Sequence, residues 1–243
     1  MVELLIAYSP NNNHKVFMSS KKARNSQPSQ NSAQFQPLQT RTPTQERYLA
    51  AIKNNTVTIA VGPAGTGKSY VAASYAAEQL FYRRIDKLIL SRPIVEAGET
   101  LGFLPGDLDE KYQPYIAPFR EILDEKLGKS FVDYLLKTKA IEAVPMQFMR
   151  GRTFKNCVVI LDEAQNATQA QIKLLLTRLG EDAKCIMDGD LEQMDLPTNL
   201  SGLGDALKRL KGIPSIATVE FHRNEVVRSK ICSQILQAYD KKL

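Results

Sequence analysis

Residues 62–69 read GPAGTGKS, which satisfies the phosphate-binding pattern G-x-x-x-x-G-K-S/T in full. The glycines let the backbone curl tightly, so that successive N–H groups can point inward at phosphate oxygens. Lys68 can reach the β- and γ-phosphates of a nucleotide, and the Ser69 hydroxyl can ligate Mg²⁺. The pattern predicts ATP and Mg²⁺ as cofactors, held by Gly62, Pro63, Ala64, Gly65, Thr66, Gly67, Lys68, Ser69 and Tyr70.

Two acids, Asp162 and Glu163, follow the apolar stretch CVVIL farther along the chain. Asp162 can hold Mg²⁺ beside Ser69, directly or through water. Glu163 can orient and deprotonate an attacking water, which favours hydrolysis over phosphate transfer to a small molecule. In the alternative interpretation, both acids only cap the next helix.

Two glutamines are further candidates. Gln193, in the segment GDLEQ, can sense a γ-phosphate or position a water, although a polar turn would use the same residues. Gln45, in TPTQ, sits where a capping box places its glutamine. Its amide could also read the edge of adenine, and both interpretations stay open.

Phosphoryl transfer gains from an arginine placed against the charge of the transition state, and the glycine loop supplies none. Arg223 and Arg228 are the candidates, of which we favour Arg228. The spacing does not say whether such an arginine acts in its own subunit or in a neighbour. Ordinary surface salt bridges are the alternative.

Basic residues also suggest a contact with nucleic acid. Arg92 ends an expected strand near the site, and Arg150 and Arg152 flank a glycine. Nearby aromatic residues at near-helical spacing could stack bases along a charged groove, or could simply pack a helix against the core. These aromatic residues are Tyr112, Tyr115 and Phe119.

Composition sets the broad class. With 43% hydrophobic and 24% charged residues, the chain resembles an ordinary globular protein. Its three cysteines lack metal-ligand spacing and suit a reducing interior. The opening MVELLIAYS is a poor signal peptide and the sequence holds no apolar run long enough for a bilayer. We therefore expect no membrane contact and a cytoplasmic location, in the host cytoplasm if the protein is viral.

The chain divides by composition into a polar segment, 1–41, and a domain, 42–243. The first segment is rich in Asn, Gln, Ser, Thr and Pro, so it cannot bury enough apolar surface to offset its ordering entropy. Residues 1–43 carry +4 of the net charge of +6, with five bases against Glu3. A basic tail is compatible with an acidic partner, but a solvated tail would look the same.

Apolar strands alternate with amphipathic helices in the domain, which predicts an α/β fold with a mostly parallel sheet and helices on both faces. Ligands in such folds bind at the carboxyl ends of the strands, where GPAGTGKS and DEAQ fall. Strands are expected at 56–62, 88–93, 157–164, 183–190 and 216–221, and helices at 42–54, 68–81, 107–127, 169–179, around 202–211 and at 225–239. Pro114 and Pro118 should break or kink the third helix, and Gly180 should stop the fourth.

Together these segments resemble the PhoH family, P-loop ATPases of the phosphate-starvation type, in a short form such as bacterial viruses often carry. The resemblance runs from about residue 42 to 240, and its long block SRPIVEAGETLGFLPGDL is specific to that family among P-loop proteins. The other matching segments are TPTQERYLAAI, GPAGTGKSYVAA, MRGRTFKNCVVILDEAQNAT, GDLEQMDLP and EVVRSKI.

The resemblance implies a RecA-like core, similar to one half of a superfamily-one helicase. It implies that Gln45 reads adenine, that Gln193 senses the γ-phosphate, and that Arg92, Arg150 and Arg152 lie near a path for RNA or single-stranded nucleic acid. Some relatives carry a PIN nuclease domain, for which this chain has no room, so we expect no nuclease activity. By the resemblance, we expect the polar tail to stand in the place of the upstream domain of longer relatives.

A tandem helicase encloses ATP between two such cores, whereas this chain has one. We therefore expect a homo-oligomer, a ring such as a hexamer, in which Arg228 or Arg223 reaches the neighbour's γ-phosphate. The first hypothesis is an ATP-driven motor or remodeller, with or without helicase activity, on RNA or single-stranded DNA. The second is a nucleotide switch that acts on proteins. A small-molecule kinase is disfavoured by Glu163.

Overall fold

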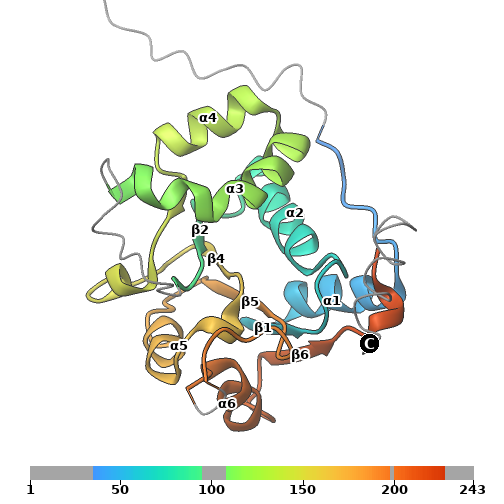
Figure 1. Cartoon of the computed structure of the whole chain (residues 1–243). Coiled ribbons are helices and arrows are strands. Elements are labelled where there is room, and N and C mark those ends of the chain that lie inside the picture. The colour runs from blue at the N-terminus through green and yellow to red at the C-terminus, as the bar shows by residue number, and fades with distance from the viewer. Residues whose placement is uncertain (1–34, 95–107, 198–199, 228–243) are drawn as a thin grey trace, which may run out of the picture. The chain divides into compact units, whose positions relative to one another are not determined.

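Six short strands form one sheet in the order β3-β2-β4-β5-β1-β6, and every neighbouring pair is parallel (Figure 1). Both β1 and β4 are buried along their whole length, as expected of strands that are covered on both faces. The strands are β1 Val57–Val61, β2 Lys87–Ser91, β3 Ile141–Ala143, β4 Cys157–Leu161, β5 Lys184–Gly189 and β6 Ile216–Glu220. The predicted α/β class is confirmed.

The structure, a computed structural model, describes residues 35–94, 108–197 and 200–227, with the backbone alone at 108–116. These residues belong to one compact unit, Ala33–Leu243. The helices are α1 Pro43–Asn54, α2 Lys68–Phe81, α3 Leu108–Leu127, α4 Lys129–Lys137, α5 Gln169–Leu176 and α6 Gly202–Arg209, with short 3₁₀ helices η3 Met146–Met149, η4 Ala164–Asn166 and η5 Arg223–Glu225. Within the described ranges, no helix is long and apolar enough to span a bilayer.

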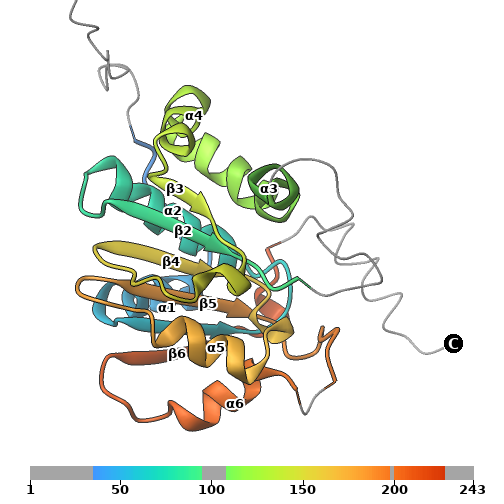
Figure 2. The same ribbon diagram turned by 90° about the vertical axis from the view of Figure 1, so that its left-hand side faces the viewer.

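Helices cover both faces of the sheet because successive strand side chains point to opposite sides. On β2, Leu88 and Leu90 pack with α1, α2, α3 and α4 in one core cluster. Ile89, between them, packs into a second cluster with α5, α6 and η3. Figure 2 shows α5 and α6 on one side of the sheet, with α1 and α2 on the other.

The first helix is fixed at both ends. Thr42 is its N-cap and accepts a hydrogen bond from the Gln45 N–H at 3.2 Å, with Pro43 in the first helical position, as predicted. At the other end, Lys184 Nζ donates to main-chain carbonyls that the helix leaves without partners. These are the carbonyls of Ile52, Lys53 and Asn55, at 3.0, 3.0 and 2.7 Å.

The third helix is not broken at its prolines, because α3 continues through Pro114 and Pro118. A proline removes its own N–H donor, but burial of Phe119, Leu123 and Leu127 holds the helix on the core. The burial of Phe119 also favours packing over base stacking for this ring. The Tyr112 and Tyr115 side chains lie outside the described residues.

The fourth predicted helix also ends differently. Its C-cap is Thr177, three residues before Gly180, and Gly180 does not adopt a positive φ. A β-carbon at Gly180 would lie 3.0 Å from the Phe154 carbonyl oxygen, so this glycine permits close packing instead of stopping the helix. The sequence prediction also missed α4 and β3. The predicted helix at 225–239 lies outside the described residues beyond Val227, as does most of the polar segment 1–41.

Two glycines of α6 provide a matched test of its packing. A β-carbon at Gly202 would lie 2.6 Å from the main-chain carbon and oxygen of Thr168, whereas nothing lies within 4 Å of one at Gly204. We expect Gly202→Ala to lower the free energy of unfolding by about 1–3 kcal/mol, because backbone cannot yield. Gly204→Ala should raise it by about 0.5–1 kcal/mol. Denaturant unfolding of both variants checks this, and equal effects would contradict the packing described for Gly202.

Candidate active site

The loop between β1 and α2 has the backbone that phosphate binding requires. Gly62, Gly65 and Gly67 adopt φ values of 139°, 80° and 86°, which side chains disfavour. A β-carbon at Gly62 would lie 2.3 Å from the Phe221 carbonyl oxygen, so only glycine fits there. Gly67 is the N-cap of α2 and gives no side-chain hydrogen bond. The first N–H groups of α2 are thus available to an anion.

Lys68 lies within this loop with only 8% of its surface exposed. Its Nζ donates to the carbonyl oxygens of Gly62 at 2.6 Å and Pro63 at 2.9 Å. Burial lowers the pKa of Lys68, while neighbouring carboxylates, Asp188 and Asp190 foremost, oppose that change. The cation is held by weak acceptors of the loop itself, which phosphate oxygens can replace.

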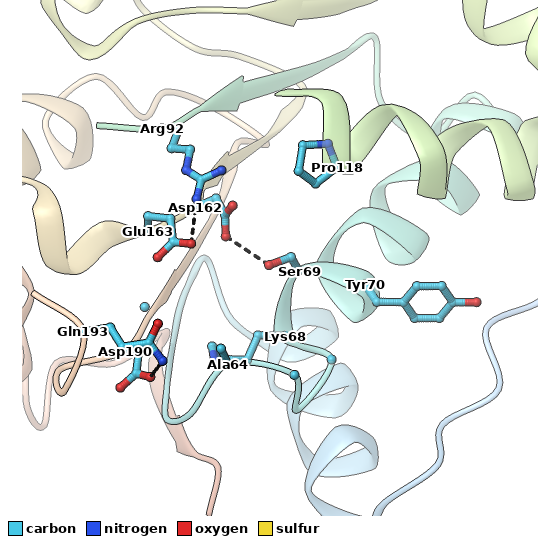
Figure 3. Close-up of a pocket in the computed structure, with 13 residues that line it drawn as sticks. Ala64, Lys68, Ser69, Tyr70, Arg92, Pro118, Asp162, Glu163, Asp190 and Gln193 are labelled. Carbon is cyan, nitrogen blue, oxygen red and sulfur yellow. Dashed lines mark hydrogen bonds and ion pairs between the residues drawn. The ribbon is translucent and has the colours of Figure 1, made fainter. Parts of the chain in front are cut away.

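Ser69 and Asp162 come together from different elements, α2 and the end of β4. The Ser69 hydroxyl donates to Asp162 Oδ1 at 3.0 Å (Figure 3). Burial raises the pKa of Asp162, and the Arg92 guanidinium opposes this rise. A hydroxyl and a carboxylate at this separation fit Mg²⁺, which takes one or two carboxylates together with substrate phosphates.

Glu163 is held on both carboxylate oxygens. Its Oε1 pairs with an Arg92 guanidinium nitrogen at 2.7 Å, and its Oε2 accepts from Gln165 Nε2 at 2.6 Å. Its backbone lies in the left-handed region, with φ 52° and ψ 40°, which is uncommon for a residue with a side chain. Such strain persists only where the surroundings hold it, and it aims the carboxylate at the cavity in Figure 3.

Gln165 joins this acid to the segment after β5, a role that sequence reasoning missed. Its side chain is buried, its Nε2 also donates to the Gln193 carbonyl oxygen at 3.1 Å, and its Oε1 accepts from Asp190 N at 3.1 Å. Gln193 Nε2 in turn donates to Asp190 Oδ2 at 2.8 Å. The available signal was an amide two residues after the candidate base, in DEAQ.

A cavity of about 310 Å³ gathers these side chains at the carboxyl ends of β1, β5 and β4. Its lining includes most of the predicted residues. It consists of Ala64, Gly65, Gly67, Lys68, Ser69, Tyr70, Arg92, Pro118, Asp162, Glu163, Gly189, Asp190 and Gln193.

Gln45 is near the loop, but its amide is engaged. Its Nε2 donates to the Thr66 carbonyl oxygen at 2.9 Å, and its Oε1 accepts from Arg41 N at 2.8 Å. Its side chain therefore reaches past the Thr42 N–H that a capping box would use. In this arrangement Gln45 ties the start of α1 to the phosphate loop.

The predicted arginines lie in different places. Arg152 is away from the cavity, where it pairs with Glu142 at 2.6 Å and lies over the Phe154 ring. Arg150 is exposed after η3 and lines another groove. Arg223 pairs with Glu192 at 2.6 Å. Arg228 lies outside the described residues, although the preceding Val227 donates its N–H to the Gly65 carbonyl oxygen at 2.8 Å.

Comparison with known proteins shows which family the chain belongs to. Residues 37–240 match the family described as PhoH-like protein. The chain belongs to the PhoH family. It is 46% identical over 206 residues to Protein PhoH of Escherichia coli (strain K12), an alignment that covers 84% of this chain and 58% of that protein. It is 47% identical over 210 residues to the PhoH-like protein of Bacillus subtilis (strain 168), covering 86% of this chain and 66% of that one.

The PhoH-family chain thus spans 58% and 66% of the length of these two relatives. Among solved structures, the large terminase from a thermophilic bacteriophage is similar with a TM-score of 0.46 and 12% identity, covering 87% of this chain and 52% of that one. The Pif1 helicase of Candida albicans is similar with a TM-score of 0.37 and 16% identity, covering 76% and 41%. The α/β class with a parallel sheet and helices on both faces, which the family resemblance implied, is confirmed by the six parallel strands and the two core clusters.

A second buried group in this PhoH-family site escaped the sequence prediction. Asp188, on β5, accepts a hydrogen bond from the Tyr48 hydroxyl of α1. Its Oδ2 is buried and has no hydrogen-bond partner within the part of the chain described. Burial raises the pKa of Asp188 to about 7 from an ordinary value of 3.8. The carboxyl group is thus poised to titrate near neutrality.

This pKa predicts a pH dependence of stability. A raised pKa means that the folded state holds the proton more tightly, so the contribution of Asp188 is complete below about pH 4 and is lost as the pH rises to about 7. The loss is at most about 4 kcal/mol. In Asp188→Asn, whose amide oxygen can still accept from Tyr48, the decrease over this range should be smaller, with the raised pKa of Asp162 accounting for part of what remains.

Urea unfolding from pH 4 to 8 without Mg²⁺ measures the effect. Asp182→Asn, at an exposed position in the turn before β5, is the matched control and should keep the wild-type slope. An Asp188→Asn slope equal to that of wild type would show that Asp188 does not titrate in this range.

Proposed function

We propose that this PhoH-family protein hydrolyses ATP with Mg²⁺ and couples the reaction to binding or remodelling of RNA or single-stranded nucleic acid, duplex unwinding included. The observation that supports this most is the convergence of the phosphate loop, the Ser69–Asp162 pair and Glu163 on one cavity. The buried free thiols of Cys157 and Cys185 are compatible with the cytoplasm as its location.

Phosphate binding rests on the loop and on Lys68. The N–H groups at the start of α2 face the anion, and Lys68 exchanges the carbonyl oxygens of Gly62 and Pro63 for phosphate oxygens. Ser69 and Asp162 hold Mg²⁺, which supplies charge neutralisation at the phosphate oxygens when bound. The Gln45 amide keeps one N–H and one lone pair beside its bonds to Thr66 O and Arg41 N, and these are what it would offer to adenine.

Hydrolysis requires Glu163 to act as the general base. Each of its oxygens accepts one bond and keeps a second lone pair, with which it can accept a hydrogen bond from a water and then take the proton. Gln193 lies on the same cavity and is joined to Glu163 through Gln165. A phosphate contact at Gln193 therefore acts on the base through one buried amide.

The role of Glu163 predicts a separation of binding from turnover. Glu163→Gln should bind ATP within a few-fold of wild type and lose at least about 10² in turnover, because it cannot accept the proton. Lys68→Ala should weaken both, because it removes a phosphate ligand. Steady-state ATPase rates and ATP titrations, with and without single-stranded RNA or DNA at low and moderate salt, measure these effects.

Glu181→Gln, at an exposed position beyond the opposite ends of the strands, is the matched control and should leave both quantities unchanged. Wild-type turnover in Glu163→Gln would remove Glu163 from the role of base. Stimulation of wild type by strands should fade as salt rises, because phosphate contacts release counterions. Intact hydrolysis with no response to strands would instead favour a protein-directed nucleotide switch.

Self-association is the remaining part of the proposal. The cavity presents only Arg92 among arginines of the described residues, and that guanidinium is paired with Glu163. We therefore assign the transition-state arginine to Arg228 of a neighbouring subunit in a ring, with Arg223 as the alternative.

Mixing inactive subunits tests this arrangement. Lys68→Ala and Arg228→Ala proteins, each inactive alone, should regain partial ATPase activity together, because a mixed ring contains interfaces with an intact loop and an intact arginine. A mixture of Lys68→Ala with Glu163→Gln is the control, because both changes lie in the same site. If no ratio of the first pair restores activity, Arg228 does not act across subunits.

A further inference from the structure

A second groove lies between η3 and α5, on the face of the sheet opposite α2. Its volume is about 790 Å³, against about 310 Å³ for the candidate active site. Met146 and Leu174 contribute apolar floor, and Gln147 contributes an amide. None of these residues belongs to the cavity that contains the phosphate loop.

The charge of this groove is positive. Arg150, Lys173 and Arg178 line it, and no aspartate or glutamate among the described residues does. Within the same part of the chain, no carboxylate lies at ion-pair distance from any of these three cations. Arg152, two residues from Arg150, pairs instead with Glu142. The groove is therefore a place where three positive charges lack compensation by the described fold.

Arg178, in this groove, has a hydrogen-bond donor that the described residues leave unsatisfied. Its Nε is buried and has no hydrogen-bond partner in the part of the chain described. A buried donor without an acceptor costs free energy, more so on a charged group, and Arg178 lines the groove, where an anionic oxygen could pair with its guanidinium. Phe148, which follows the groove residue Gln147 on η3, exposes 52% of its surface, a large fraction for an aromatic ring.

Proteins hold a single strand with two components: cations that bind its phosphates, and aromatic rings on which its bases stack. The groove and η3 supply both. We propose that single-stranded nucleic acid lies in this groove, with its phosphates on Arg150, Lys173 and Arg178 and a base on Phe148. The assignment rests on the proposed function. It places the interface away from Arg92 and Arg152, whose guanidinium groups pair with Glu163 and Glu142.

The position of the groove connects it to the chemistry. Thr168 caps α5 through a capping box with Gln171, and η4 joins this cap directly to Glu163. A strand bound along α5 therefore contacts the helix that follows the candidate base. A bound strand then alters the hydrolysis rate through a short stretch of backbone.

Fluorescence anisotropy of labelled oligo-uridine and oligo-thymidine, titrated with the full chain over a range of salt, tests the assignment. The triple variant Arg150→Ala, Lys173→Ala, Arg178→Ala should bind at least about ten-fold more weakly, and its slope against the logarithm of salt should fall by about 2. Basal ATPase without strands should stay as in wild type. The relative affinities for the two oligomers identify RNA or DNA as the preferred strand.

The matched control removes three exposed cations of α1 and α4, on the other face of the sheet, with Lys53→Ala, Lys129→Ala and Lys137→Ala. It should bind within about two-fold of wild type, because charge away from the groove acts only at long range. Should the triple variant fail to fold, Lys173→Glu alone, at an exposed position, should weaken binding more than Lys129→Glu does.

Three results would overturn the assignment. Equal weakening in the groove and control variants would place the strand elsewhere and leave the proposed function intact. If the wild type hydrolyses ATP but binds neither oligomer at low salt, the nucleic-acid part of the proposed function fails together with the groove. If poly-glutamate binds as tightly as the strands and depends on the same three cations, the occupant is an acidic peptide.

Discussion

The carboxyl ends of β1, β5 and β4 lie side by side, because β5 pairs in parallel with both of its neighbours. In this register Val61 lies opposite Gly189, and Leu161 lies opposite Met187. The loop after β1, the acids after β4 and the amides after β5 must then meet at one edge. A shift of one residue in any pair would turn buried side chains toward the wrong face, so the two core clusters hold this register.

Carboxylates surround the Lys68 cation at this edge of the sheet. Four carboxylates raise the pKa of Lys68 against the effect of its burial. Each acid meets a different environment: Asp188 is buried beside Tyr48, Asp162 accepts from Ser69, and Glu163 pairs with Arg92. Acids that differ in this way can serve different purposes at one pH, with one binding a cation and another accepting a proton.

Sequence reasoning located the loop, the acids and most helices and strands, because each depends on local signals such as glycine spacing and apolar runs. It could not find the partners of Gln45 or Arg152, because their side chains are held by residues far away in sequence, Thr66 and Glu142 among them. The sequence prediction missed Asp188 for a related reason. A carboxylate near the end of a strand looks like any loop acid until Tyr48 is placed against it.

Gln165 makes contacts of this kind with two consequences: it packs against the end of β5, and it holds Glu163 by a hydrogen bond. A β-carbon on Gly189 would lie 2.9 Å from Gln165 Oε1 and 2.4 Å from Leu203 Cδ2, so the amide packs directly on the end of β5. Its oxygen and nitrogen are both bound, to Asp190 N and to Glu163, and a buried amide in such packing has no alternative rotamer of similar energy. A movement of the segment after β5 can therefore reach Glu163 through Gln165. A closely packed polar contact transmits displacement, whereas a solvated one would absorb it.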